Sequence, residues 1–422
     1  MEIKQHNIYF PIFFLLCWLG FTIYIFVYGP YVYKLIRPSV FYTYLLAVHL
    51  ALIFGYIRGQ QSLGRESRIK INYYRFVKIT IIISFVYFIV KLLLTFGGDL
   101  RNFSETFINA RKTYVTSSIR HSNLFSYLDI FFTPISLIAI TNTLFCYKNL
   151  RRRYRYSVFI LILFTIASAI GSATRSGIVQ IAIISLAAFS LGIYKKNIII
   201  KTYQKVLIFL LVIGLGIGFL IYSALLTDTR GGKIVVNPLT HQPPRKDFFL
   251  TRITPPKFHS MINNISFYTS HSYYRLNKAM NMPFNGLGFG LSNSYFIMDN
   301  IESVTGWSGL KNISYGVRLD EGIGSSYGLY WSTFYTWIAS DFTFPGTVIV
   351  IFFIGYFLSL SLKDSLYFMN PLSVTVFCTL FFNIFHFAFN NPLQDGSGLT
   401  TGLVVPLIWL ILRKSNREIS TV

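Results

Sequence analysis

The chain has few charged residues for its length. Asp, Glu, Lys and Arg make up 13% of its 422 residues, whereas 53% are hydrophobic and 18% are aromatic. An ordinary soluble domain carries roughly 25% charged residues. The scarcity of charge therefore argues against a soluble globule and indicates that lipid surrounds most of the chain.

Cysteine and the common cofactor motifs are also scarce. Cys17, Cys146 and Cys378 lie inside apolar runs without pairing or metal-binding spacing, so neither a disulfide framework nor a thiolate metal site is expected. The sequence has no Walker-type loop, no dinucleotide-binding glycine fingerprint after a strand and no His or Cys cluster. We therefore expect no metal and no cofactor, and an activated substrate or a gradient would have to supply energy.

Long apolar runs dominate what is present. A helix rises 1.5 Å per residue, so about 20 apolar residues cross a hydrocarbon core of ~30 Å. The first run has no small-residue cleavage pattern after it and reads as a retained membrane helix. The sequence predicts an all-α polytopic membrane protein with about ten transmembrane helices, at residues 8–28, 39–57, 77–96, 127–147, 157–172, 176–193, 206–226, 343–361, 371–390 and 399–412.

These runs divide the chain into three parts. Residues 1–226 hold spans one to seven, and residues 343–422 hold spans eight to ten and a tail. Between them, residues 227–342 are rich in Gly, Asn, Ser, Pro and Tyr, and form the one segment large enough for a soluble subdomain. We expect it to be a large external loop of short helices.

The basic residues predict the orientation. The net charge of +23 would suggest nucleic acid in a soluble protein, but in a membrane protein Lys and Arg in short loops mark the cytoplasmic side. One set of alternate loops and ends carries 20 basic residues, against 7 in the short loops opposite. Both termini are therefore predicted in the cytoplasm and the large loop outside, with no nucleic-acid partner.

Two arginines stand at the predicted external ends of spans. Arg175 lies in the short turn between spans five and six, where the N-terminus of the next helix would share an anion with its guanidinium. Arg230 is followed by two glycines, which allow backbone amides to approach a bound anion. Both positions suit a phosphate or pyrophosphate, although an Arg at a helix end can also extend to water, and a loop exit can carry solvated charges.

The predicted loop holds further candidates. Residues 266–275 alternate aromatic, small polar and basic residues, including His271 and Arg275, a composition that suits sugar rings and equally suits a packed interfacial helix. Arg318 stands beside Asp320 and Glu321, where a carboxylate could act as a general base or simply form a surface ion pair. In the ninth span, His386 and Asn383 lie one helical turn apart, which indicates a polar cavity or a hydrogen bond between helices.

The pattern resembles the bacterial oligosaccharide repeat unit polymerases, the Wzy family of O-antigen and capsule polymerases. The layout of spans, Arg175 in a short external turn and the large late loop carry the resemblance, together with short local motifs. These motifs are residues 230–232, 286–290, 322–327 and 341–346. One departure is that the acidic residue usual after the Gly-Ser-Ser turn is replaced by Leu329 or Tyr330, so Asp341 is the next carboxylate candidate.

The resemblance implies a glycosyltransferase that joins undecaprenyl-pyrophosphate-linked oligosaccharides at the outer face of the bacterial cytoplasmic (inner) membrane. Arg175 and Arg230 would stabilise the departing pyrophosphate, and His271, Glu321 and Asp341, in that order, are candidates for the base. A chain-length regulator protein is an implied partner, besides membrane lipid. The substrate-binding candidates are Arg275, Arg318, Gly324, Ser325, Ser326 and His386.

Three other functions remain open on the sequence. An O-antigen ligase type of enzyme would use the same donor and pass the glycan to a different acceptor. A lipid-linked oligosaccharide flippase or other transporter would show charges within several spans and internal repeats. Here the spans hold few charges, chiefly Lys91, and the sequence has no internal repeat. A non-catalytic assembly partner would not need the two arginines.

Overall fold

The computed structural model describes residues 8–69, 72–95, 124–171, 176–196, 198, 203, 214, 218, 236–322 and 330–414. These residues fall into two compact units. The first unit comprises residues up to 51, 200–350 and 384–391, and the second comprises 52–199, 351–383 and 392 onward.

The described chain is helical apart from one isolated bridge between Ser67 and Arg413. Within the described residues, seven helices are long and apolar enough to cross a membrane. They are α1 (Phe10–Tyr28), α2 (Pro38–Gln61), α3 (Tyr73–Thr95), α5 (Leu124–Phe145), α6 (Arg152–Gly171), α7 (Ser176–Tyr194) and α14 (Phe334–Phe368).

Shorter helices complete the two units. They are α9 (Phe249–Ile253), α10 (His259–Ala279), α11 (Tyr295–Thr305), α12 (Gly309–Ile313), α13 (Tyr315–Glu321), α15 (Pro371–Phe385), α16 (Gly396–Leu399) and α17 (Val405–Leu412). A π-helical turn at Thr400–Val404 joins α16 to α17, so that one apolar helix runs over Gly396–Leu412.

The all-helical prediction is confirmed, and the count of ten spans stays a prediction. Seven of the predicted runs correspond to the seven long apolar helices, and the ninth and tenth correspond to shorter apolar helices, α15 and Gly396–Leu412. The run at 206–226 lies outside the described residues except for Gly214 and Gly218. The described part therefore supports a multi-pass arrangement without fixing the number of spans.

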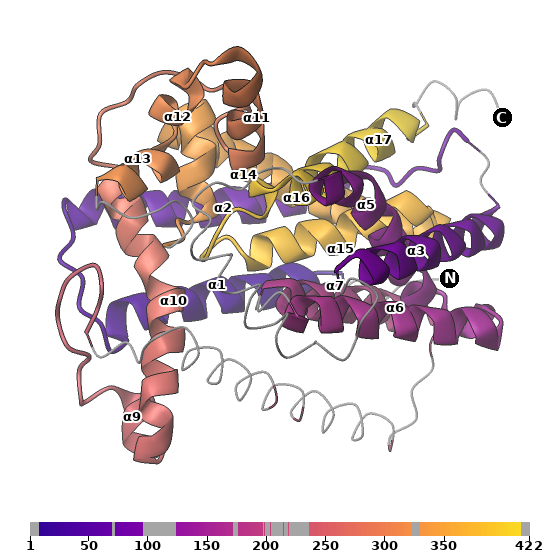
Figure 1. Cartoon of the computed structure of the whole chain (residues 1–422), viewed down its shortest axis with the longest axis horizontal. Coiled ribbons are helices and arrows are strands. Elements are labelled where there is room, and N and C mark those ends of the chain that lie inside the picture. The colour runs from indigo at the N-terminus through magenta and orange to yellow at the C-terminus, as the bar shows by residue number, and fades with distance from the viewer. Residues whose placement is uncertain are drawn as a thin grey trace. The chain divides into compact units, whose positions relative to one another are not determined.

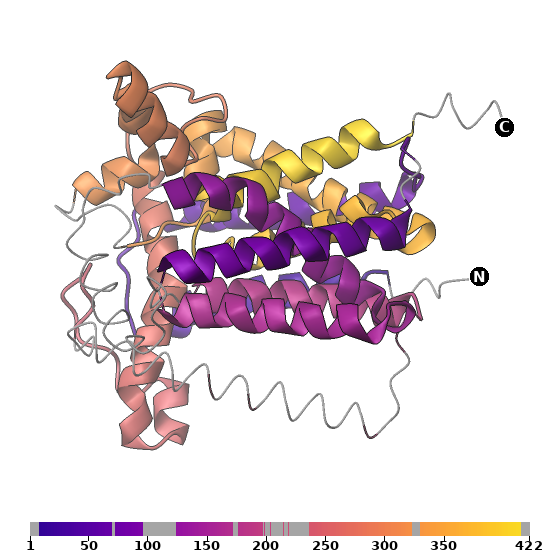
Figure 2. The same cartoon turned by 45° about the vertical axis from the view of Figure 1, so that its right-hand side comes forward.

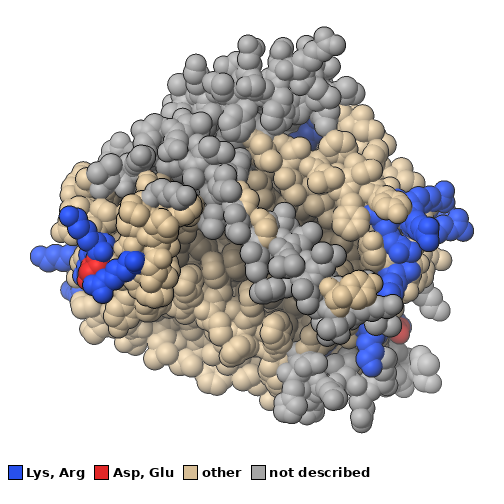
Figure 3. All heavy atoms as spheres, turned by 90° about the horizontal axis from the view of Figure 1, so that it is seen from below, with Lys and Arg blue, Asp and Glu red and all other residues tan. Residues whose placement is uncertain are grey.

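Large apolar side chains lie on the outside of these helices. Phe13, Leu46, Leu163 and Ile349 are between 60% and 64% exposed, although each belongs to a long apolar helix. Figure 3 shows a broad surface without charged side chains, beside margins where Lys and Arg gather. Exposed apolar area of this extent is costly in water and favourable in lipid, so these faces are suited to the bilayer.

In the first unit, α10 runs across α1 rather than alongside it (Figures 1 and 2). The Thr22 hydroxyl of α1 is hydrogen bonded to the Tyr273 hydroxyl of α10 at 2.9 Å. Asn277 of α10 is paired with the backbone of Ile36 in both directions, at 2.8 Å each. The segment after α1 is thus fixed to α10, which is longer than the short helices predicted for this loop.

In the second unit, α3, α5, α6 and α7 pack together as a bundle. The loops at one end of this unit carry many cations, and several bonds hold the helix ends there together. Lys195, just after α7, donates to the carbonyl of Leu366 near the end of α14, and Lys363 donates to the carbonyl of Gln60 at the end of α2. These bonds hold the ends of α2 and α7 to the end of α14.

Glycine allows α2 and α14 to meet backbone to backbone. Gly55 and Gly59 stand one turn apart on α2, and a Cβ at Gly55 would collide with the carbonyl oxygen of Phe352. On α14, a Cβ at Gly355 would collide with the carbonyl of Leu52. Small residues four positions apart permit this close approach of membrane helices. A larger residue at Gly55 or Gly355 would therefore require a backbone to move.

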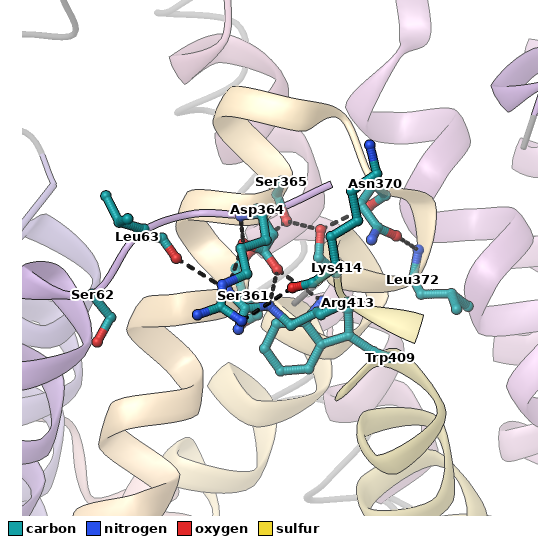
Figure 4. Close-up of polar contacts among 12 residues, drawn as sticks. Ser62, Leu63, Ser361, Asp364, Ser365, Asn370, Leu372, Trp409, Arg413 and Lys414 are labelled. Carbon is teal, nitrogen blue, oxygen red and sulfur yellow. Dashed lines mark hydrogen bonds and ion pairs between the residues drawn. The ribbon is translucent and has the colours of Figure 1, made fainter. Parts of the chain in front are cut away.

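A buried carboxylate joins three segments at the basic end of the second unit (Figure 4). Asp364 of α14 is fully buried and accepts hydrogen bonds from Arg413 Nε at 2.7 Å and Arg413 Nη2 at 3.1 Å. It also accepts from Trp409 Nε1 at 3.1 Å and from the Arg65 backbone N–H at 2.8 Å. Asp364 therefore ties the end of α17 and the segment after α2 to α14.

Candidate functional site

Several predicted site residues lie outside the described residues. These are Arg175, Arg230, Gly324, Ser325 and Ser326. The remaining candidates belong to the first unit, where α10 carries His271 and Arg275, α13 carries Arg318 and Glu321, and α14 carries Asp341. His386 also belongs to this unit and follows α15.

Arg275 is buried in an ion pair. Its Nη2 lies 2.6 Å from Asp320 Oδ1, and the two side chains are 4% and 5% exposed. Nε donates to Ser332 Oγ at 2.8 Å, and Nη2 also donates to the carbonyl of Gly316 at 3.4 Å. Burial lowers the pKa of Arg275 while Asp320 raises it, yet a guanidinium stays protonated in proteins. The Arg275 side chain thus holds α13 and the segment just before α14 to α10.

His271 uses both ring nitrogens within the protein. Nδ1 lies 2.9 Å from the carbonyl of Phe267, and the Trp331 backbone N–H donates to Nε2 at 3.1 Å. Nδ1 must therefore carry the proton, and Nε2 accepts. Burial lowers the pKa of His271 to about 3, so the ring is neutral at neutral pH. To take a substrate proton, Nε2 would have to give up its bond to Trp331.

Three half-buried aromatic side chains surround His271. The Tyr268 ring centroid lies 6.0 Å from that of His271 and 5.9 Å from that of Trp331, and the Tyr330 centroid lies 6.4 Å from that of His271. We call Tyr268, Tyr330 and Trp331 the aromatic surface. Amphipathic rings of this kind can pack against the C–H faces of sugars while their polar atoms bond hydroxyls.

The Arg275 ion pair lies next to the aromatic surface in the chain. Tyr330 and Trp331 directly precede Ser332, which accepts a hydrogen bond from Arg275. His271 and Arg275 are four residues apart on α10 and so lie on one face of that helix. The structure therefore brings His271, Arg275, Asp320 and the aromatic surface together.

Asp341 has a different set of partners. Its buried carboxylate accepts from the Ser292 backbone N–H at 2.8 Å and from Asn293 Nδ2 at 2.6 Å. Asn391 Nδ2 donates to the Asn293 carbonyl at 2.7 Å, and a Cβ at Gly288 would collide with Asp341. Asp341 thus anchors the glycine-rich turn at 286–290, and the need for a small residue at 288 explains that glycine.

The other candidates stand apart from these two networks. Arg318 is half-buried, donates to the carbonyl of Pro283 at 2.9 Å and lies 5.5 Å from the centroid of the Tyr315 ring. Glu321 ends α13 with its side chain exposed. His386 is half-buried, with its ring centroid 5.9 Å from those of Phe385 and Phe389.

Sequence reasoning missed Ser332 and Trp331 as partners of Arg275 and His271. Both follow the glycine-serine turn that the sequence singles out, so the turn marked the neighbourhood without marking these residues. Their bonds join residues 57 and 60 positions apart in the chain. No local pattern signals a pairing of that kind.

The apolar helices define the class: this is a multi-pass membrane protein of helical type. Comparison of the chain with protein families, with curated proteins and with solved structures found no match.

Proposed function

We propose that the chain is a membrane glycosyltransferase that joins lipid-pyrophosphate-linked oligosaccharide repeat units, as the repeat unit polymerases do. The observation that carries the proposal is the aromatic surface beside the buried Arg275 and Asp320 pair, in the segment between the apolar helices. Rings and hydroxyls fixed in this way suit a sugar acceptor, and fixed geometry is what a transfer between two bound substrates requires. The resemblance in sequence supplies the donor class.

The proposed reaction exchanges one bond to the anomeric carbon of the donor for another. A hydroxyl oxygen of the acceptor sugar attacks that carbon, and the bond to the pyrophosphate oxygen breaks. The lipid pyrophosphate leaves with the electron pair, and a base takes the hydroxyl proton. Arg175 and Arg230 are proposed to stabilise the leaving pyrophosphate, because cations placed where charge develops lower the barrier.

The geometry changes the order of the candidate bases. The acceptor atoms of His271 and Asp341 already receive hydrogen bonds from Trp331, Ser292 and Asn293. Glu321 has an exposed side chain and can reach a substrate without breaking such a bond. We therefore place Glu321 first, and assign Arg275 the task of positioning the aromatic surface.

The proposed location is the outer face of the bacterial cytoplasmic membrane, with both termini in the cytoplasm. The clustering of basic loops at one end of the second unit supports this orientation, because Lys and Arg are retained on the cytoplasmic side. The segment that carries the aromatic surface would then face the lipid-linked glycan.

The test is to delete the gene in its host and complement it with wild type, Arg175→Ala, Arg230→Ala or Glu321→Gln at matched membrane levels. Arg252→Ala is the matched control, because Arg252 is an exposed arginine of the loop that holds Arg230 and Glu321. Surface polysaccharide is then separated on a gel. We expect single-repeat glycan from the deletion, long chains from the control, and few or none from the arginine variants.

Other patterns would point elsewhere. Long chains that accumulate on the lipid carrier at the outer face would indicate the ligase type of transfer. Repeats trapped on the cytoplasmic side would indicate a flippase. Long chains restored by both arginine variants would contradict the assigned roles and favour a non-catalytic assembly partner.

A further inference from the structure

A second polar site lies within the second unit, on helices other than those that carry the aromatic surface. A cavity of about 220 Å³ is lined by α3, α5, α6, α7 and the start of α16. Charged, hydroxyl, amide and aromatic side chains line it together, although each of these helices except α16 is a candidate membrane span. The polar and aromatic side chains of the lining include Tyr87, Phe88, Lys91, Asp129, Ser136 and Gln180.

The cavity lies at the end of the bundle opposite the basic loops. Lys91 stands about one turn before the end of α3, and Gln180 about one turn after the start of α7. The opposite ends of α6 and α7 carry Arg152 and Lys195. On the orientation proposed above, a ligand would therefore enter from outside the cell.

Its two charges neutralise each other. Lys91 Nζ lies 2.6 Å from Asp129 Oδ1, and the two side chains are 30% and 28% exposed. The Tyr87 hydroxyl also donates to Asp129. Within the described lining this pair carries no net charge, and it presents a strong acceptor and a strong donor side by side.

One buried hydroxyl in the wall has no hydrogen-bond partner among the described residues. Ser136 is 6% exposed and lines the cavity, and its Oγ, which is covered and unpaired there, reaches a ligand by rotation about χ1. A buried polar group without a partner costs free energy, and native structures seldom keep one. Two residues earlier, Pro134 interrupts α5 and lacks the N–H that would bond the Ile130 carbonyl. This stretch of α5 therefore holds hydrogen-bonding groups that are available to a ligand.

We propose that this cavity binds one neutral sugar residue. A sugar hydroxyl both donates and accepts, which matches Asp129, Lys91, Ser136 and Gln180 in one wall. The Phe88 ring supplies an apolar face for the C–H groups of a pyranose, and the volume suits one ring rather than a longer glycan. The inference does not rest on the proposed transfer reaction, because a transporter or an assembly partner that handles glycans would need the same site.

The test uses the full-length protein in nanodiscs and saturation-transfer NMR. Glucose, galactose, rhamnose and N-acetylglucosamine are the neutral probes, and inorganic pyrophosphate is the charged competitor. The variants are Ser136→Ala and Asp129→Asn, with Asp299→Asn as the control, since Asp299 belongs to an ion pair in the first unit. Elution on size exclusion verifies the fold of each.

We expect at least one neutral sugar to bind wild type and the control equally. Loss of the Ser136 hydroxyl should weaken binding about three- to tenfold, and loss of the Asp129 charge about tenfold or more. Ser136→Ala removes a group without a described protein partner, so this variant stays informative if Asp129→Asn fails to fold. The proposal is overturned if no probe binds folded wild type, if both variants bind as wild type does, or if pyrophosphate displaces the sugar at lower concentration. These measurements do not depend on polysaccharide synthesis, so either proposal can fail alone.

Discussion

Arg275 is a cation whose donors are largely used within the protein. Its bonds to Asp320, Ser332 and Gly316 hold three chain segments at the aromatic surface, and both charges of the pair are almost completely buried. A buried pair contributes little net stability over an apolar replacement, but loss of one partner leaves the other charged and unpaired. The cost of substitution should therefore depend on whether one or both residues change.

At this scale we predict that Arg275→Met lowers the free energy of unfolding by about 3–5 kcal/mol, because Asp320 is left buried without its partner. Lys311→Met is the control, since Lys311 pairs with Asp299 and Glu302 on half-exposed side chains and should cost about 1 kcal/mol or less. Thermal unfolding in detergent measures both. The double variant Arg275→Met and Asp320→Leu should recover part of the stability lost in Arg275→Met. Equal loss of stability in Arg275→Met and Lys311→Met would contradict the interpretation.

At the scale of elements, the segment after α2 and the end of α17 are joined to α14 through Asp364. The contact includes a short pairing of extended chain, in which the Arg68 N–H donates to the Leu412 carbonyl at 2.7 Å and the Lys414 N–H to the Glu66 carbonyl at 3.0 Å. These bonds join the segment after α2 to the end of α17, the same two segments that the Asp364 carboxylate contacts. The end of the described chain is therefore an integral part of the second unit.

We predict that Arg413→Ala destabilises the protein by about 3 kcal/mol or more, because it leaves the fully buried Asp364 without its cation. The neighbouring Lys414→Ala is the matched control, since Lys414 pairs with Glu66 on partly exposed side chains. That pair should be worth less than about 1 kcal/mol. Inactivation half-lives of the two variants in detergent measure the difference, and similar half-lives would show that Asp364 needs no cation.

Much of the element pattern could be predicted from the sequence, because apolar runs of the length of a bilayer identify helices without reference to partners. The eighth span was predicted from residue 343, whereas α14 begins at Phe334. Thr343, with φ of 65°, and Pro345 interrupt α14, so the predicted start falls at this break. The helical residues before the break include Ser340 and Asp341, which end the apolar run in the sequence. Loop helices such as α10 lack a continuous apolar run, so the sequence did not give their lengths.

The candidate site was less predictable. The four-residue spacing of His271 and Arg275 put them on one helical face, as the sequence implies. Whether each is free for a substrate depends on Trp331, Asp320 and Ser332, which come from distant parts of the chain. Composition suggests a binding surface, but only tertiary contacts decide which polar groups remain available.

At the scale of the whole molecule, the basic loops and the segment with the aromatic surface should lie on opposite sides of the membrane. We predict that a cysteine at Ser308 reacts with a membrane-impermeant thiol reagent in spheroplasts, and that one at Gln61 reacts only after permeabilisation. Both positions are exposed. The three native cysteines are first replaced by serine, and the reverse labelling pattern would contradict the orientation.

The glycine contact between α2 and α14 bears on how such a protein can diverge. Apolar residues that face lipid can be exchanged for one another at little cost, so most of the surface is open to drift. At Gly55 and Gly355 even one added methyl group meets a backbone atom of the opposite helix. Selection should therefore retain glycine at these two positions, however much the rest of the sequence changes.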